Sequence, residues 1–356
     1  MSVAPKISIA LATYNGARYL PEQLQSLAAQ HYLPIEIVAC DDGSRDETLE
    51  VLQAFRGTAP FPVRIYRNEV NLGFSDNFLK AARLCNGEWI AFCDQDDVWL
   101  PEKLKNAAEA IEKNEKALLV LQNAILYDAE LKAPGRLFPD TLKAGSYGAA
   151  SQYGFWVWLG FLQTFRASML KDFSVSNRPI NYYPGHAVQS HDKWTCMIAN
   201  ALGGIVVLDK PVALYRRHPD TVTGDYHHQK PSERVAKALC VSSENYRFLA
   251  NVAGSTVNYF NRAAYEHKSD KLKEISLAAE NGFRQIEHIQ LLRAQLYSSD
   301  NMFSRLCFFL KVLVSGGYWG PHFTAMGGMS AAKDLAAVLR LIGRTAASMH
   351  PTDPAL

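Results

Sequence analysis

Two hydrophobic periodicities alternate along the first part of the chain. Four short, β-rich apolar runs lie at residues 7–13, 35–40, 63–67 and 89–93, and such runs are typical of buried strands. Between them, apolar residues recur every three or four positions, which predicts helices around 20–27, 49–55 and 74–85. Strands that alternate with helices indicate an α/β fold, with a mainly parallel sheet covered by helices on both faces.

The pattern changes after residue 128. Residues 154–165 form an aromatic, strand-like run, and residues 191–202 predict a helix. The stretch 205–218 predicts two short strands joined by a turn at Asp209, Lys210 and Pro211. From about residue 228 the pattern is helical to the end.

Two local signals refine these predictions. Ser44 and Glu47 have the spacing of a capping box, which places a helix start at Ser44. The segment 303–319 is strongly apolar but carries Arg305 and Lys311, so it predicts either a helix at a membrane interface or a helix buried in the core.

Composition and charge narrow the classes of function. The chain has 37 Lys and Arg residues against 35 Asp and Glu residues, a balance that argues against a nucleic-acid partner. The six cysteines lack metal-site spacing, which indicates reduced thiols. Neither a signal peptide nor an apolar run of ~18 residues is evident. We therefore expect a cytoplasmic protein, with peripheral association at the inner face of the cytoplasmic membrane as an option.

Polar and acidic residues follow each predicted strand. Asp41 and Asp42 follow the second strand, and Asp94, Asp96 and Asp97 follow the fourth. In open parallel sheets the carboxyl ends of the strands converge on one ligand crevice. Because no glycine-rich phosphate loop is present, carboxylates that hold Mg²⁺ or Mn²⁺ are the expected phosphate anchor. The alternative is that Asp96 and Asp97 only cap the next helix, but the second acidic loop favours a metal.

The chain resembles a known family in several ordered motifs. They are ISIALATYNG, VACDDGSRDET, RNEVNLGFSDNFLKAARLCNGEWIAFCDQDDVWLPEKL, SHDKW and YRRH, and they lie within residues 5–224. Together they are similar to the inverting glycosyltransferases of family 2, which have the GT-A fold, and most similar to bacterial rhamnosyltransferase-like members. This resemblance implies a Rossmann-like GT-A domain over 1–225, with a nucleotide-sugar half (1–128) and an acceptor half (129–225). Residues 226–356 are then a helical C-terminal region and a candidate for membrane association.

The resemblance also implies roles for individual residues. Asp192 matches the general base, and Asp96 and His218 match metal contacts. The implied donor-binding residues are Thr13, Tyr14, Asn15, Asp41, Asp42, Arg67, Asn68, Asn71 and Asp94. Simpler structural roles compete with some of these: Asp192 could be only a helix N-cap, His218 an exposed residue at a hairpin end, and Asp42 and Asp97 turn or cap residues.

We therefore expect a metal-dependent, inverting sugar transferase. Its donor would be dTDP-rhamnose or a UDP-sugar, and its acceptor a saccharide or lipid-linked saccharide of bacterial surface polysaccharide biosynthesis. One alternative is a sugar-1-phosphate nucleotidylyltransferase, although the first strand ends in TYNGARYL rather than in a glycine- and arginine-rich loop. The other alternative is a module that binds a nucleotide-sugar without turnover.

Overall fold

The computed structural model describes residues 4–128, 133–138, 143–182, 187–218 and 241–339. The chain divides into two compact units, which are considered separately below. Unit 1 comprises Met1–Ala149, Val157–Val175 and Ser190–Thr221. Unit 2 comprises Ala150–Trp156, Ser176–Gln189 and Val222–Leu356.

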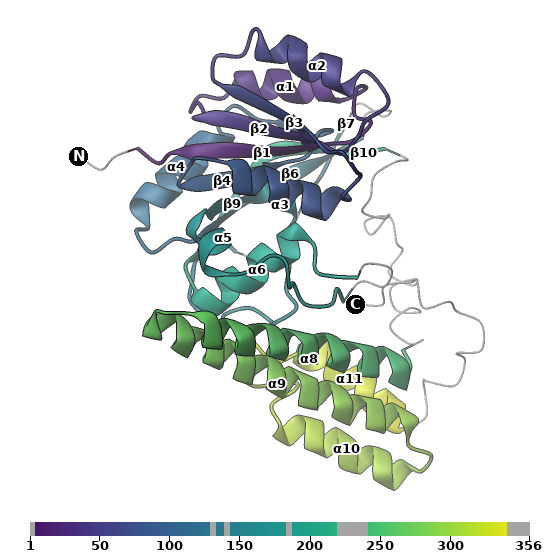
Figure 1. Cartoon of the computed structure of the whole chain (residues 1–356). Helices are drawn as coiled ribbons and strands as arrows, with labels where there is room; N and C mark the ends of the chain where they lie inside the picture. The colour runs from purple at the N-terminus through teal and green to yellow at the C-terminus, as the bar shows by residue number, and fades with distance from the viewer. Residues whose placement is uncertain (1–3, 129–132, 139–142, 183–186, 219–240, 340–356) are drawn as a thin grey trace. The chain divides into compact units, whose positions relative to one another are not determined.

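Unit 1 is built on a sheet, which has ten strands over the described residues (Figure 1). The strands are β1 (Ile7–Thr13), β2 (Glu36–Asp41), β3 (Val63–Arg67), β4 (Trp89–Cys93), β5 (Val98–Trp99), β6 (Leu119–Asp128), β7 (Ala133–Phe138), β8 (Gly145–Tyr147), β9 (Gln163–Arg166) and β10 (Ile205–Arg217). Their order is β3-β2-β1-β4-β9-β6-β10-β5, with β7 beside β6 and β8 beside β10. The pairs among β1 to β4 and the pair of β6 with β10 are parallel, whereas β9 runs antiparallel to both of its neighbours.

Helices cover this sheet on both sides. They are α1 (Leu20–Ala28), α2 (Thr48–Arg56), α3 (Phe74–Leu84), α4 (Lys103–Lys113), α5 (Ser168–Asp172) and α6 (His191–Leu202), with a short 3₁₀ helix at Gly160–Leu162. Helices α1 and α2 lie on one face, and α3 packs against β1, β2 and β4 on the other (Figure 1). Every residue of β1, β2 and β4 is buried, as expected for strands covered on both faces. The predicted fold class is confirmed.

The aromatic run 154–165 is mostly irregular, and its prediction as a strand is wrong. Only its last residues enter β9. Side chains rather than a strand ladder satisfy this backbone: the Trp158 indole donates to the Gln122 carbonyl at 2.8 Å, and the Gln163 amide donates to the Trp158 carbonyl at 2.6 Å. A Cβ at Gly160 would lie 2.4 Å from His191 Nε2, so the backbone can approach α6 only because this residue is glycine.

The predicted turn at residues 209–211 is also wrong, because β10 is one continuous strand. Its parallel register with β6 shifts between Val207 and Pro211 and again before Ala213. Proline has no N–H to donate to the ladder, so it is accommodated at an irregularity in the strand.

The predicted capping box is not formed. Helix α2 begins at Thr48, its N-cap is Glu47, and no side chain caps it. The Ser44 hydroxyl donates instead to the Asp41 carboxylate. Ser44 therefore belongs to the turn after β2 rather than to the helix, and its hydroxyl also accepts from the Asn15 N–H at 2.9 Å.

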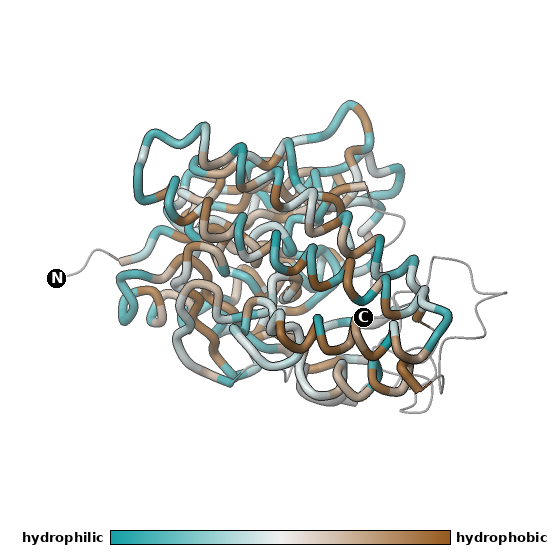
Figure 2. Tube along the Cα trace, turned by 90° about the horizontal axis from the view of Figure 1, so that it is seen from below, coloured by the Kyte–Doolittle hydropathy of each residue, from teal (hydrophilic) through white to brown (hydrophobic). Residues whose placement is uncertain are grey.

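Over the described residues, the helices of unit 2 are α8 (Ser243–Glu266), α9 (Asp270–Ser298), α10 (Met302–Val314) and α11 (Gly327–Val338). Brown and teal positions alternate along the helical turns in Figure 2, as the periodicity predicts. Helices α9, α10 and α11 share a core that includes Ile289, Val312 and Ala331. The helical prediction is confirmed over the described part, whereas 228–240 and 340–356 lie outside it. Among the described residues, no helix has the length and apolar character needed to cross a membrane.

Candidate functional site

A pocket of about 610 Å³ lies at the carboxyl ends of β1, β2 and β3. Its lining residues are Tyr14, Asp42, Gly43, Arg45, Arg67, Asn68, Glu69 and Asn71. Five of the predicted donor residues are therefore brought together in one place. The prediction missed Gly43, Arg45 and Glu69, although each is within a few residues of a strand end and could have been included on that ground.

Asp42 organises one wall of this pocket. One of its carboxylate oxygens accepts hydrogen bonds from the Asn68 amide at 2.6 Å and from the Leu72 N–H at 2.8 Å, and the other accepts from the Gly73 N–H at 2.8 Å. The Lys80 ammonium donates to Asn68 at 2.7 Å and adds positive charge beside the carboxylate. A single buried aspartate thus holds the loop that follows β3.

Asp41 is used within the chain at both carboxylate oxygens. One oxygen accepts from the hydroxyls of Thr13 and Ser44, and the other accepts from the N–H groups of Gly43 and Ser44. Asp41 is fully buried and does not line the pocket described above. Its clear task in this structure is to shape the turn after β2.

The loop after β1 is tied to the loops after β2 and β4. The Asn15 side chain accepts from the Arg45 N–H at 2.9 Å, and the Asn15 backbone adopts φ 46°. The Gln95 amide binds both the N–H and the carbonyl of Tyr14, at 2.9 and 3.0 Å. A Cβ at Gly16 would lie 2.1 Å from Gln95 Oε1, so any larger residue there would displace the Gln95 amide. Gln95 was missed by the prediction, although it stands between Asp94 and Asp96.

The three aspartates after β4 form a cluster. A carboxylate oxygen from each of Asp94, Asp96 and Asp97 lies within 4.8 Å of the other two. Asp97 is 1% exposed; one of its oxygens accepts from the Arg216 N–H at 3.1 Å, and the other is buried without a hydrogen bond. Burial and then the neighbouring carboxylates raise the pKa of Asp94 and of Asp97 well above the ordinary range. The cluster therefore concentrates negative charge that a bound cation would stabilise.

The end of β10 completes this cluster. His218 Nε2 lies 2.8 Å from Asp96 Oδ2, and the His218 ring packs on Tyr19 with centroids 4.6 Å apart. The Arg216 guanidinium donates to the Asp96 carbonyl at 2.8 Å and forms an ion pair with Glu22. Arg216 was missed by the prediction, although it belongs to the YRRH motif that carries His218.

The donor set of this cluster suits a hard divalent cation. Carboxylate oxygens are the preferred ligands of Mg²⁺ and Mn²⁺. The buried Asp97 oxygen without a hydrogen bond is the further observation that agrees with an ion at this position. Lys103, in the first turn of α4, is fully buried. Burial lowers the pKa of its ammonium group to about 7, whereas the charges of Cys93, Asp97 and Asp94 act to raise that pKa.

Asp192 reaches the same region from α6. It is the second residue of this helix, and Ser190 is the N-cap, so the alternative that Asp192 is itself the N-cap is wrong. One Asp192 oxygen accepts from the Ser190 hydroxyl and from the Lys193 N–H. Its charge contributes to the raised pKa of Asp94. The fold therefore brings a carboxylate from α6 close to the acidic cluster at the end of β4, across about a hundred residues of sequence.

Comparison with known families agrees with this geometry. Residues 8–169 match the family model described as glycosyl transferase family 2. An uncharacterized glycosyltransferase of Nostoc is 37% identical over 111 residues, which cover 31% of this chain and 34% of the relative. A dTDP-rhamnosyl transferase of Shigella flexneri is 35% identical over 127 residues, which cover 35% of this chain and 41% of that protein. The chain spans between 34% and 59% of the length of the first curated relatives it matches.

A solved structure supports the fold. The Staphylococcus aureus protein TarS (residues 1–349), in complex with UDP-GlcNAc, superposes with a TM-score of 0.52 at 21% identity, over 86% of this chain and 81% of that one. Residues 8–169 are thus similar to family 2 glycosyltransferases, and the fold is GT-A-like.

Proposed function

We propose that this family 2 domain moves a sugar from a nucleotide-diphosphate donor to a hydroxyl group of an acceptor. The observation that carries the proposal is the cluster of Asp94, Asp96 and Asp97 beside the pocket at the ends of β1 to β3. Gln95 links the two, because it belongs to the acidic loop and binds the backbone of Tyr14 in the pocket lining. A nucleotide in the pocket would then direct its diphosphate toward the cluster.

The donor we propose is dTDP-rhamnose or a UDP-sugar. The partial similarity to a dTDP-rhamnosyl transferase supports the first. Arg45 and Arg67 in the pocket lining supply positive charge for a nucleoside diphosphate. Tyr14, which is 48% exposed, offers an aromatic face to the base.

Asp96 and His218 would hold the divalent metal, with Asp94 and Asp97 beside them. When bound, Mg²⁺ or Mn²⁺ would stabilise the negative charge that develops on the departing nucleoside diphosphate. Arg216 keeps the acidic loop in place through its contacts with Asp96 and Asp97. Glu22 in turn holds the Arg216 guanidinium.

Asp192 is the general base in this proposal. It lies in the first turn of α6, at the helix N-terminus. The Ser190 hydroxyl orients one oxygen and leaves the other for the acceptor hydroxyl. One carboxylate that accepts the proton as the hydroxyl attacks implies a single displacement with inversion. The acceptor we propose is a saccharide or lipid-linked saccharide in bacterial surface polysaccharide assembly.

The test is an assay of the purified chain with UDP- and dTDP-linked sugars and a panel of saccharide and lipid-linked acceptors. We expect nucleoside diphosphate release that depends on Mn²⁺ or Mg²⁺ and falls roughly 100-fold or more in Asp96→Ala. Asp172→Ala, which removes an exposed aspartate of α5, is the matched control and should keep the activity.

Three outcomes would contradict the proposal. Sugar transfer that proceeds equally well in excess chelator would show that the reaction does not need a divalent metal. Release of pyrophosphate from a nucleoside triphosphate and a sugar phosphate would identify a nucleotidylyltransferase. Tight donor binding without turnover on any acceptor of the panel would favour a binding module.

A further inference from the structure

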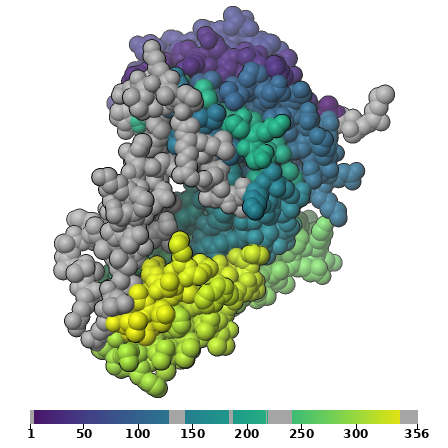
Figure 3. All heavy atoms as spheres, turned by 180° about the vertical axis from the view of Figure 1, so that it is seen from behind, coloured from purple at the N-terminus to yellow at the C-terminus, as the bar shows by residue number. Residues whose placement is uncertain are grey.

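Three side chains converge on the ring of Tyr19. This half-buried tyrosine is the N-cap residue of α1, in the purple part of the chain near the top of Figure 3. Its ring centroid lies 4.6 Å from that of His218, and the guanidinium carbons of Arg18 and Arg216 each lie 5.0 Å from it. Tyr19 is absent from the lining of the pocket at the ends of β1 to β3, so these contacts are not explained by that pocket.

Two of the three side chains also contact the acidic loop after β4. The Arg216 guanidinium donates to the Asp96 carbonyl at 2.8 Å, and His218 Nε2 lies 2.8 Å from Asp96 Oδ2. The Arg216 N–H donates to Asp97 at 3.1 Å. The end of β10 is therefore bound both to the acidic loop and to the residue that begins α1.

Arg216 is held by several groups besides Tyr19. The ring centroid of Tyr127 on β6 lies 5.4 Å from its guanidinium carbon, and Glu22 of α1 forms an ion pair with it. The Glu22 side chain is 56% exposed, so the ion pair contributes little by itself. The hydrogen bonds to Asp96 and Asp97 and the contact with Tyr127 remain if the Tyr19 ring is removed. We therefore expect Arg216 to stay in place without that ring.

His218 depends on ring packing for its orientation. Its side chain is 9% exposed, and its ring plane is tilted by 34° from that of Tyr19. An imidazole can turn about two side-chain bonds, so its nitrogen faces Asp96 only while the groups around the ring keep it there. A contact between two aromatic rings is worth roughly three- to ten-fold in an equilibrium constant. Tyr19 is therefore able to favour the orientation of His218 in which Nε2 meets Asp96.

We propose that Tyr19 is a positioning residue for the metal site, because its ring holds the imidazole of His218 toward Asp96. This inference rests on the proposed function, which takes Asp96 and His218 as the residues that would hold the divalent metal. It adds the residue that orients one of them before the metal binds. The alternative is that Tyr19 only packs α1 onto the fold. Its removal would then affect stability without a selective effect on metal affinity.

The test is a titration of the full chain with Mn²⁺, with and without UDP, followed by the electron paramagnetic resonance signal of free Mn²⁺. Tyr19→Leu removes the ring and should weaken Mn²⁺ binding roughly three- to ten-fold. Tyr19→Phe keeps the ring and should stay within about two-fold of the original chain. Tyr147→Leu is the matched control. Tyr147 is also half-buried, and its strand β8 pairs with the start of β10, at the other end of that strand from His218.

A double-mutant cycle shows whether Tyr19 acts through His218. His218→Ala should weaken Mn²⁺ binding by itself. Tyr19→Leu added to it should change the affinity by less than about two-fold, because the side chain that Tyr19 orients is already absent. UDP affinity measured without metal should be the same in all of these variants, since neither residue lines the pocket.

Several results would overturn the inference. They are an unchanged Mn²⁺ affinity in Tyr19→Leu, effects that add in the double variant, and a loss of metal-free UDP affinity as large as the loss of Mn²⁺ affinity. The last result would show that Tyr19 supports the whole region rather than His218. If Asp96→Ala weakens Mn²⁺ binding and Tyr19→Leu does not, the inference fails and the proposed metal site stands. If the original chain binds no Mn²⁺ with or without UDP, both fail.

Discussion

Adjacent aspartates in this protein have different tasks, which are set by their partners rather than by their residue type. Asp41 shapes the turn after β2, whereas Asp42 holds the loop after β3 and also lines the pocket. In the loop after β4, Asp97 binds the backbone of β10, and Asp96 faces His218. At the residue scale, the carboxylates of the proposed site therefore differ in how far their oxygens are already hydrogen-bonded within the chain.

Asp192→Asn tests the proposed base. Asparagine keeps the size of the side chain but cannot accept a proton, so transfer should fall by roughly 10²- to 10⁴-fold. Because Asp192 is absent from the lining of the pocket at the ends of β1 to β3, donor affinity should stay within about two-fold of the original. Steady-state kinetics and calorimetry measure the two quantities. Transfer at the original rate would show that Asp192 is not the general base, and it would not affect the proposal for the metal site.

Asp42→Asn tests the wall of the pocket. An amide has one acceptor oxygen instead of two, so at least one of the N–H groups of Leu72 and Gly73 would lose its partner. We expect nucleoside diphosphate affinity to fall roughly ten-fold and the free energy of unfolding to fall by about 1–3 kcal/mol. Titration calorimetry with UDP and dTDP checks the first effect. Asp172→Asn serves as control, and equal affinity in the two variants would contradict the prediction.

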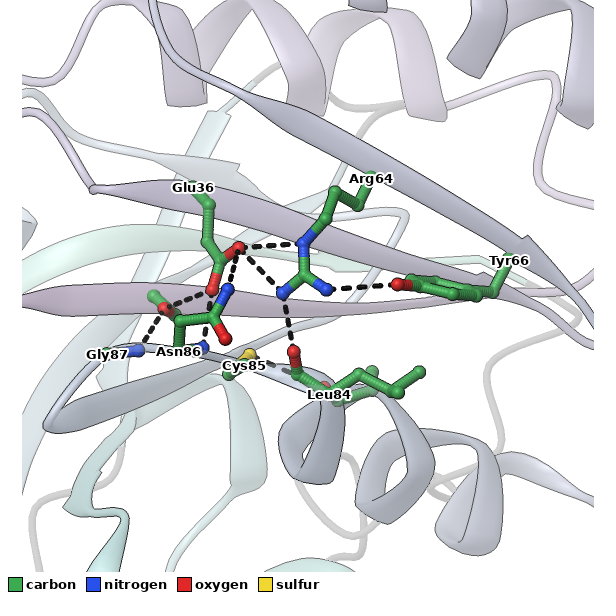
Figure 4. A network of polar contacts seen from close by, with 9 residues as sticks. Glu36, Arg64, Tyr66, Leu84, Cys85, Asn86 and Gly87 are labelled. Carbon is green, nitrogen blue, oxygen red and sulfur yellow. Dashed lines mark hydrogen bonds and ion pairs between the residues drawn. The ribbon is translucent and has the colours of Figure 1, made fainter.

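At the scale of elements, Glu36 joins the sheet at the end opposite the site. Its carboxylate accepts from the Ser8 hydroxyl of β1 at 2.9 Å, the Arg64 guanidinium of β3 at 2.8 Å and the Asn86 N–H before β4 at 2.6 Å (Figure 4). Arg64 continues the network to the Tyr66 hydroxyl and the Leu84 carbonyl. One buried carboxylate thus links the four parallel strands that carry the pocket.

This network makes stability depend on pH. Burial alone would raise the pKa of Glu36, but the hydrogen bonds from Asn86, Arg64 and Ser8 lower it below the ordinary value of 4.5. The stabilisation is therefore complete above that value and is lost as the pH falls through the lower folded-state pKa. We expect Glu36→Gln to cost about 1–3 kcal/mol at neutral pH, and the difference from the original chain to shrink as the pH falls below 4.5 through the lowered folded-state pKa.

Urea unfolding at a series of pH values measures this difference. Glu50→Gln, an exposed glutamate on α2, is the control and should follow the original chain throughout. If Glu36→Gln lowers the free energy of unfolding by the same amount at every pH of the series, the charge of the carboxylate is not the source of the stabilisation.

At the scale of the whole molecule, the chain forms two units and passes between them several times. The segments Ala150–Trp156 and Ser176–Gln189 belong to unit 2, although their neighbours in sequence belong to unit 1. Within unit 2, Gly154 donates its N–H to the Phe323 carbonyl at 3.0 Å, and the Ile180 N–H donates to the Ser255 hydroxyl at 3.0 Å. The helical unit is therefore completed by residues that precede it.

Asp334 is the polar centre of unit 2. It receives two hydrogen bonds from the Arg293 guanidinium, at 2.7 and 2.9 Å, and one each from the hydroxyls of Tyr297 and Tyr318. Asp334→Ala leaves a buried guanidinium without its counter-ion, so it should destabilise this unit by about 3–5 kcal/mol. Unfolding followed by circular dichroism measures the loss. Asp270→Ala, which removes a side chain that is 92% exposed, should have little effect.

Nucleotide affinity provides the complementary measurement. Every residue of the pocket lining belongs to unit 1, so the affinity should persist in Asp334→Ala under conditions where unit 1 remains folded. Loss of nucleotide binding together with the first loss of helical signal would show that the two units unfold as one.

The sequence by itself determined the elements of unit 1 that depend on local periodicity. The strands at 63–67 and 89–93 and the helix at 191–202 begin and end where the pattern predicts. A strand buried on both faces, such as 89–93, produces a continuous apolar run, and helices produce steps of three or four, so both signals are carried by neighbouring residues. The fold class followed from their alternation, and the polar strand ends indicated where a site would lie.

Only the tertiary structure decided features whose partners are far apart in sequence. It made residues 205–217 one strand through pairing with β6, brought the Ser44 hydroxyl to the Asn15 N–H, 29 residues away, and placed Arg216 against Asp97, 119 residues away. It also left the apolar face of α10 exposed, where periodicity allowed a core helix equally well. The physical reason is that hydrogen-bond partners and burial are set by chain segments that meet only on folding, whereas periodicity reports only which side chains share a face.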